Sequence, residues 1–145
     1  MPRRRYTNPF YAPPDRPAGP YLPIRLVNPI DNISFVWNCL VYTGADTCLF
    51  TAALASLTGH SLTADGVLSD VTSGIEGRHL ATWKHTFVLE LLHPTAPGNV
   101  VWKSRRGFFE CLDHDDFSPL LGVTDFLRYF KVTLDYPNAT ITLEW

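Results

Sequence analysis

The residues with the clearest chemical potential lie in one short segment, LVYTGADTCLF, at residues 40–50. Apolar residues lead into Thr43 and Gly44, and apolar residues resume at Cys48. A strand that ends in a Thr-Gly turn exposes the residue at the tip of the turn, because glycine permits tight turns and close approach of two backbone segments. That residue is Tyr42. A phenol at such a tip is neutral at physiological pH, whereas a smaller acidic residue would present a carboxylate.

Histidines, one cysteine and a short acidic run are the other groups that could bind a ligand. The candidate metal ligands are His79, His85, His93, His114, Cys111 and Asp113. They lack the tight spacing of a zinc site, and the DHDD run at residues 113–116 predicts a solvated loop. No nucleophile elbow, phosphate loop or dinucleotide motif is present in the sequence. The sequence therefore predicts neither a metal nor a cofactor.

Composition is that of a globular domain. The chain has 145 residues, of which 46% are hydrophobic and 18% are charged, and its formal net charge is -2. The apolar share is sufficient for a core, and so weak a net charge does not favour a nucleic-acid partner. No apolar run approaches the roughly 20 residues that cross a bilayer, so no membrane partner is predicted. The three cysteines lack paired spacing, which predicts a reducing, cytoplasmic location.

Residues 1–20 differ from the rest because they are rich in proline. Proline fixes φ and removes a hydrogen-bond donor, which excludes this segment from helices and from central strands. We interpret residues 1–20 as an extended arm with a solvated basic cluster at residues 3–5, and residues 21–145 as the folded domain. Aromatic residues that could dock the arm on a partner are Tyr6, Phe10 and Tyr11. An unattached tail is the simpler expectation.

From residue 21 onward the pattern is mainly that of β-strands. Alternating apolar residues and β-branched or aromatic runs predict strands within 21–28, 33–42, 60–71, 79–92, 100–112 and 131–145. The Ala- and Leu-rich segment 51–59 predicts a helix that ends at Gly59, and a second short helix is predicted from Thr124 as its N-cap. The sum is an all-β domain, a closed or partly closed barrel with one or two short helices.

Three separated features then occur in a specific order. They are YTGAD at 42–46, SGIEG at 73–77 and LLG at 120–122. In this order they resemble the Asp-Thr-Gly-Ala loop, the flap and the Leu/Ile-Gly element of the retropepsin-like aspartic proteases, which include retroviral proteases and bacterial relatives. The resemblance covers residues 21–145. It implies a retropepsin-like closed β-barrel and a two-fold homodimer with one active site at its interface.

The chemistry of that family requires two carboxylates, one from each subunit, which share a proton because like charges so close cannot both ionise. The ionised member acts as general base on a water, and the protonated member polarises the scissile carbonyl. The resemblance places this carboxylate at position 42 and completes the catalytic turn with Thr43 and Gly44. Because Tyr42 stands there, and two phenols cannot supply the ionised base, the chain is predicted to be catalytically inactive.

The resemblance also implies which residues bind substrate. These positions are Ala45, Asp46, Gly74, Ile75, Glu76 and Gly77. Asp46 does not replace the missing acid, because it lies four residues beyond the catalytic position. Besides Tyr42, two residues depart from the family pattern: Glu76 stands where the flap usually has glycine, and Val123 stands where retroviral members commonly have arginine.

Three functions stay open from the sequence. The first is an inactive homodimer that keeps a groove under its flaps for a peptide or protein ligand. The second is an active aspartic endopeptidase of this family, of which the present chain is an active-site variant whose parent has aspartate at position 42. The third is a structural subunit of a larger assembly.

Overall fold

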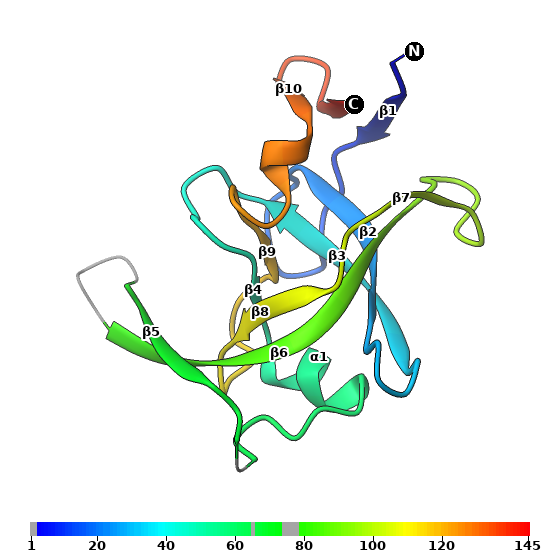
Figure 1. The fold of residues 1–145 in the computed structure, drawn as a ribbon. Coiled ribbons are helices and arrows are strands. Elements are labelled where there is room, and N and C mark those ends of the chain that lie inside the picture. The colour runs from blue at the N-terminus through cyan, green and yellow to red at the C-terminus, as the bar shows by residue number, and fades with distance from the viewer. Residues whose placement is uncertain (1–2, 65, 74–78) are drawn as a thin grey trace.

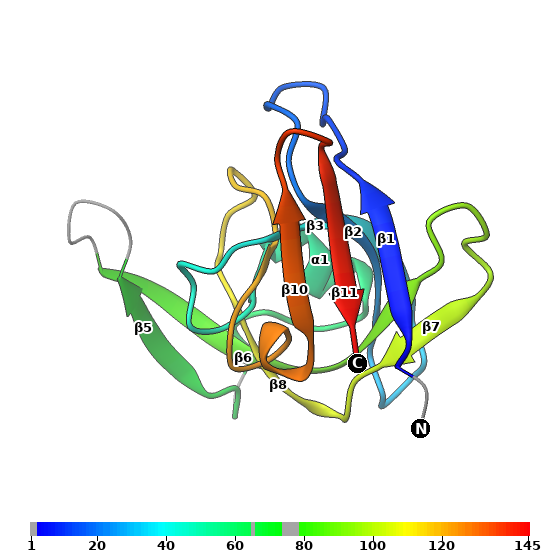
Figure 2. The same ribbon diagram turned by 90° about the horizontal axis from the view of Figure 1, so that it is seen from above.

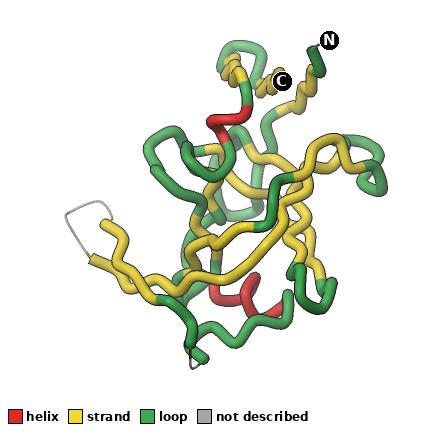
Figure 3. Tube along the Cα trace, viewed as in Figure 1, coloured by secondary structure: helices red, strands yellow, loops and turns green. Residues whose placement is uncertain are grey.

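The computed structural model describes residues 3–64, 66–73 and 79–145, and β-strands dominate them (Figure 1). The strands are β1 (Arg5–Pro9), β2 (Tyr21–Val27), β3 (Ser34–Val41), β4 (Leu49–Phe50), β5 (Ser69–Ser73), β6 (His79–Leu92), β7 (Val100–Lys103), β8 (Gly107–Cys111), β9 (Leu120–Leu121), β10 (Lys131–Asp135) and β11 (Thr140–Glu144). Within this described part, the helical segments are α1 (Ala52–Leu57) and the 3-10 helix η2 (Leu127–Tyr129), which Figure 3 shows as short interruptions. The all-β fold class with one or two short helices is confirmed.

The larger sheet has a ring-like strand order. Its path runs β2-β3-β9-β4-β8-β6-β5, with β7 paired to β6, and an additional pairing of β2 with β6 closes the ring. β6 extends over 14 residues and pairs with β2, β5, β7 and β8, so it connects most of the sheet (Figure 1). Its length explains how one strand can both close the ring and extend beyond it toward β5 and β7.

The alternation of apolar residues in β6 determines which face of this strand points to the interior. Phe87, Leu89 and Leu91 recur at every second position, and all three are 0% exposed. Successive side chains of a strand point to opposite faces, so this spacing directs three large apolar groups to the interior. The predicted strand at 79–92, with these residues on one face, is confirmed.

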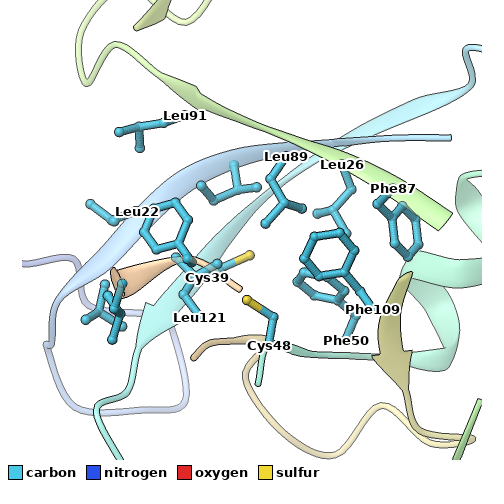
Figure 4. Packing of buried hydrophobic residues seen from close by; sticks show 14 of the residues in the cluster. Leu22, Leu26, Cys39, Cys48, Phe50, Phe87, Leu89, Leu91, Phe109 and Leu121 are labelled. Carbon is cyan, nitrogen blue, oxygen red and sulfur yellow. The ribbon is translucent and has the colours of Figure 1, made fainter. Parts of the chain in front are cut away.

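The core lies inside this ring, where apolar side chains from β2, β3, β4, β6, β8 and β9 converge (Figure 4). The ring of Phe50 lies 5.6 Å from that of Phe87 and 5.8 Å from that of Phe109, measured between centroids. Cys39 and Cys48 project into the same cluster from β3 and from the segment before β4. The core therefore packs directly behind the loop that joins β3 to β4.

The predicted helix at 51–59 is confirmed as α1. Thr51 caps it, because its side-chain oxygen accepts a hydrogen bond from the Leu54 N–H at 3.2 Å. Gly59 follows the end of the helix with φ of 85°, a left-handed conformation that glycine adopts without steric cost. Leu54 and Ala55 provide the buried face of α1.

Two of the other predicted elements differ from the structure, and one agrees with it. The expectation of a helix capped by Thr124 is wrong: only the 3-10 helix η2 forms, and the Thr124 hydroxyl instead donates to the Asp46 carbonyl oxygen at 2.7 Å. The strand predicted within 60–71 begins only at Ser69, because residues 60–64 and 66–68 form turns and loop. The hairpin predicted at 131–145 is confirmed as β10 and β11.

The interpretation of residues 1–20 as an unattached tail is wrong for β1. β1 pairs antiparallel with β11, which places β11 between β1 and β10 in a three-stranded sheet (Figure 2). Tyr6 is 5% exposed, and its hydroxyl donates to the Leu92 carbonyl oxygen at 3.0 Å. Proline is compatible with this arrangement because β1 is an edge strand. The backbone nitrogen of Pro9, which has no hydrogen to donate, can face away from β11.

Candidate functional site

The loop at residues 42–48 leaves β3 and returns as β4, on either side of β9. β3 pairs parallel with β9, and β4 pairs antiparallel with it. The Tyr42 N–H donates to the Leu121 carbonyl oxygen at 3.1 Å, and the Ala45 N–H closes the turn by donating to the Tyr42 carbonyl oxygen at 3.2 Å. The backbone of the segment LLG at 120–122 therefore helps to hold the loop in position.

Gly122 allows the loop and the segment after β9 to lie in direct contact. A Cβ atom at Gly122 would lie 2.3 Å from both the carbonyl carbon and the carbonyl oxygen of Thr47. Beyond this contact, the N–H groups of Val123 and Thr124 donate to the carbonyl oxygens of Ala45 and Asp46 at 2.9 and 2.8 Å. Two segments far apart in sequence thus fix each other's backbone at the candidate site.

Tyr42 lies at the tip of the loop, with its side chain folded over Gly44. The residue is 44% exposed. A Cβ atom at Gly44 would lie 2.8 Å from the phenol Cζ and 2.9 Å from the phenol oxygen. In this chain, the glycine of the motif therefore provides the space that the aromatic ring occupies.

A cavity of about 640 Å³ opens between this loop and the hairpin of β5 and β6. It is lined by Tyr42, Gly44, Ala45, Asp46, Thr47, Leu49, Val71, Thr72, Leu80, Glu110 and Leu120. The structure thus brings four of the residues expected at the site to one cavity, whereas Thr43 is exposed and does not line it. The remaining expected residues, Gly74, Ile75, Glu76 and Gly77, lie outside the described residues.

Glu110 is a cavity residue that the sequence analysis missed. Its carboxylate accepts hydrogen bonds from the hydroxyls of Thr47 at 2.7 Å and Thr82 at 3.1 Å, so it ties the loop to β6. The sequence feature that could have identified Glu110 is a single acidic residue within the aromatic segment GFFEC. Its neighbours in the strand, Phe109 and Cys111, are buried. A charge in such a strand must either be solvated or find hydrogen-bond donors.

Asp125 is a second missed carboxylate, and it contacts the end of the loop. It accepts a hydrogen bond from the Cys48 N–H at 2.9 Å. Burial raises the pKa of Asp125, and the charge of Glu110 raises it further, while the Cys48 N–H, the charge of Lys84 and the Thr124 hydroxyl lower it. The net direction is upward, so the folded protein retains the proton of Asp125 more strongly than the unfolded chain does.

Replacing Asp125 with asparagine should change how stability depends on pH. Because the pKa of Asp125 is raised on folding, its contribution to the free energy of unfolding falls as the pH rises from the ordinary aspartate pKa through the raised value. The Asp125→Asn variant has no carboxylate to ionise, so it does not lose this stability as the pH rises. Its amide oxygen can still accept the hydrogen bond from the Cys48 N–H. Urea unfolding between about pH 3 and about pH 8 should show the variant gaining stability relative to wild type as pH increases.

The matched control is Asp135→Asn. Hydrogen bonds from the Asn138 side chain and backbone lower the pKa of Asp135, which is the opposite direction. The stability that the ionised Asp135 contributes is present above the unfolded pKa and is lost as the pH falls. This control should therefore lose stability relative to wild type as pH increases. Parallel pH profiles for the two variants would contradict the environment assigned to Asp125.

Other polar groups do not form a metal site in the described residues. No three histidine, cysteine, aspartate or glutamate side chains converge there on a position for a metal ion. His60 and His85 lie with ring centroids 4.6 Å apart, but each directs Nε2 to a backbone carbonyl oxygen. The absence of a metal and of a cofactor stays a prediction. In the described part of the chain, no helix is both long and apolar enough to span a membrane.

The three cysteines are unpaired thiols in the interior. Burial raises the pKa of the Cys39 thiol well above its ordinary value, with a further contribution from Cys48, and it raises the pKa of Cys111 to about 12. These groups are therefore neutral packing residues, in agreement with their place in the core. A cytoplasmic location stays a prediction.

Comparison with known proteins is informative for the structure and not for the sequence. No protein-family model and no curated protein matches the sequence. The structure is similar to the crystal structure of a retropepsin-like aspartic protease from Rickettsia conorii, with a TM-score of 0.57 over 100% of this chain and 95% of that chain, at 16% sequence identity. The chain has a retropepsin-like fold. At this identity the similarity establishes the fold alone, and the prediction that Tyr42 replaces a catalytic aspartate remains a prediction.

Proposed function

We propose that this chain is a catalytically inactive retropepsin-like domain that binds an extended peptide between the 42–46 loop and the hairpin of β5 and β6. One observation carries the proposal. Tyr42 is 44% exposed and lines the cavity, and the sequence resemblance aligns Tyr42 with the carboxylate of the family motif. The part of the site that would perform the chemistry is aromatic, whereas the cavity beside it has the size of a ligand site.

The chemistry of a phenol supports the loss of catalysis. Aspartic proteolysis needs one ionised and one protonated acid that share a proton. Tyrosine side chains ordinarily ionise near pH ~10, so a pair of them supplies no general base under the acidic conditions in which these enzymes operate. In a two-fold dimer both copies change together, because each subunit contributes the same residue.

The other carboxylates near the loop favour structural roles. Both oxygens of Glu110 accept hydroxyl hydrogen bonds from its own chain. Asp125 accepts the Cys48 N–H and does not line the cavity. Asp46 lines the cavity, and its backbone carbonyl oxygen accepts a hydrogen bond from the Thr124 hydroxyl. The contacts of Glu110 and Asp125 support a site in which these two acids hold the loop in place.

The lining of the cavity supports a peptide ligand. Its volume of about 640 Å³ lies within the range of roughly 300–1,000 Å³ that is typical of ligand sites. Val71, Leu80 and Leu120 provide apolar contacts, and Thr72 provides a hydroxyl. Among the described residues, β5 is the terminal strand of its sheet path, so an extended peptide can add to its outer edge by β-augmentation. We further propose that two copies form a homodimer and that it operates in a reducing, cytoplasmic compartment, in keeping with the three buried thiols.

Cleavage and binding assays on the full chain test this function separately. No fragments of an unstructured protein should appear between about pH 4 and about pH 7. In fluorescence anisotropy, labelled extended peptides should bind, and Ala45→Trp, which fills the cavity, should weaken binding by about tenfold or more. Ala64→Trp is the control, since Ala64 is exposed and does not line the cavity. Cleavage that a statine-type inhibitor blocks would contradict inactivity, and equal affinity of the two variants would contradict the proposed groove.

A further inference from the structure

The outer edge of β1 lacks a partner strand in the described part of the chain. β1 ends the order β1-β11-β10, so it pairs with β11 alone. Figure 2 shows this edge on the side of β7, whereas β10 lies on the side of the 42–48 loop. The edge of β1 is therefore separate from the cavity that holds Tyr42.

Backbone groups of alternate residues point outward from this edge. Arg4 and Trp145 exchange both backbone hydrogen bonds, with N–H to oxygen pairs at 2.8 and 3.1 Å. In an antiparallel pair, residues bonded in this way alternate with residues whose backbone groups face away from the partner. Arg5 and Thr7 occupy the alternate positions, so their N–H and C=O groups are directed away from β11. These are the groups that an added strand would bind.

A hollow borders the same edge. A cavity of about 620 Å³ lies between β1 and the turn that joins β6 to β7, and a second cavity of about 290 Å³ lies along β7. The two share Arg4, Val100, Val101 and Trp145, so they form one continuous depression. We refer to it as the β1–β7 trough. The trough runs along the edge of β1, where an added strand would lie.

The β1–β7 trough is positively charged. Its arginine and lysine residues are Arg4, Arg5 and Lys103. No aspartate or glutamate is among the residues that line the two cavities. Glu144 lies opposite both Arg5 and Lys131 in register, so its single negative charge is shared between two cations and the local balance stays positive. A charge distribution of this kind favours an anionic occupant.

Apolar residues lie between these cations. Val100 and Val101 form one wall of the trough, and Trp145 contributes an aromatic surface that both cavities share. In a strand, successive side chains point to opposite faces, so an added strand presents alternate residues to the trough. Acidic residues at the positions that face the trough would meet its cations, and β-branched apolar residues at the intervening positions favour the extended conformation of the added strand.

We propose that the outer edge of β1 binds an extended peptide in which acidic and apolar residues alternate. The peptide pairs with the outward N–H and C=O groups of Arg5 and Thr7, and its carboxylates contact Arg4, Arg5 and Lys103. The competing explanation is that charged residues and Pro9 only protect an edge strand against aggregation. An edge with that role alone would bind no peptide.

Fluorescence anisotropy with the full chain tests the charge preference. The probe is a labelled peptide of about ten residues in which aspartate alternates with valine and threonine, and the comparator has asparagine for each aspartate. The acidic peptide should bind at least about tenfold more tightly at about 0.05 M salt, and the difference should shrink at about 0.5 M salt. Equal affinities, or no binding of either peptide, would overturn the proposal.

A pair of variants at Thr7 tests strand addition. Thr7→Pro removes the outward N–H together with the hydroxyl that bonds to Thr142, whereas Thr7→Val removes only the hydroxyl. The proline variant should bind the acidic peptide about tenfold more weakly than the valine variant. Because the Thr7 N–H does not face β11, both variants should keep the fold, which circular dichroism checks. Equal affinities of the two folded variants would overturn strand addition.

Variants of the arginines test the location and do not depend on Thr7. Arg4→Gln and Arg5→Gln should each weaken binding of the acidic peptide several-fold, while Arg16→Gln removes the same charge away from the trough and should have no effect. Tighter binding of an anionic vesicle or an RNA oligonucleotide than of the acidic peptide would overturn the proposal. A dimer lost in Thr7→Pro but not in Thr7→Val, without peptide binding, would assign the edge to a second copy of the chain and would equally overturn it.

Discussion

Replacing Tyr42 with aspartate should produce acid-dependent peptide hydrolysis. The substitution removes the ring that lies over Gly44 and places a carboxylate at the tip of the loop. In a two-fold dimer the two new acids would share a proton, so that one becomes a general base and the other a general acid. General acid–base groups typically contribute about 10²–10⁴-fold in rate, and we expect a gain of that order over the control. Mass spectrometry of a digested unstructured protein measures it.

The control for this variant is Tyr42→Asn, which has nearly the same side-chain shape as aspartate but cannot ionise. It should remain without activity at every pH. The activity of the aspartate variant should fall both at low pH, where both acids are protonated, and at higher pH, where both are ionised. A folded, dimeric Tyr42→Asp variant without hydrolysis would contradict the assignment of residue 42 as the catalytic position. It would also exclude an active aspartic endopeptidase as the parent of this chain.

The largest loss of stability should follow from Gly122→Ala. The added methyl group would lie 2.3 Å from the backbone carbonyl of Thr47, far inside van der Waals contact. The backbone on both sides is held, since the Cys48 N–H donates to Asp125 and the Gly122 N–H contacts the Cys48 sulfur at 3.4 Å. Relief of the overlap must therefore separate the loop from the segment after β9. We expect the free energy of unfolding to fall by about 3 kcal/mol or more.

Gly98→Ala provides the matched control for this effect. A Cβ atom at Gly98 would meet no other heavy atom within 4 Å, so the same chemical change has no steric consequence there. Its free energy of unfolding should stay within about 0.5 kcal/mol of wild type in urea titration. Similar losses in the two variants would show that the close approach at Gly122 does not hold the loop.

Local pattern was sufficient to predict the parts of the fold in which burial follows the sequence period. The alternation of Phe87, Leu89 and Leu91 located β6, and the alanine- and leucine-rich run with Gly59 located α1. Local pattern failed for β1, where the prolines argued for an unattached arm. The partner strand of β1 lies at the opposite end of the sequence, and no local rule predicts a pairing of Arg5 with Glu144.

The candidate site likewise has residues that local pattern could predict and residues that it could not. The loop from Tyr42 to Asp46 was found because its residues are consecutive and form a recognisable motif. Glu110 and Asp125 were missed because each acts through a contact with a distant segment, to Thr47 and to Cys48 respectively. A carboxylate that accepts hydroxyl or N–H donors across a fold has no signature in its own neighbours, apart from its presence in an otherwise apolar stretch.

The place of β11 between β1 and β10 also has a consequence for folding kinetics. The hydroxyls of Thr7 and Thr142 meet at 3.0 Å although the residues are 135 positions apart in the sequence. Contacts of such long range slow folding. The chain loses conformational entropy when it closes a very large loop, before the two strands form any favourable contact. β10 and β11, joined by a short turn, can associate early, whereas β1 is expected to join last and to detach first when the protein begins to unfold.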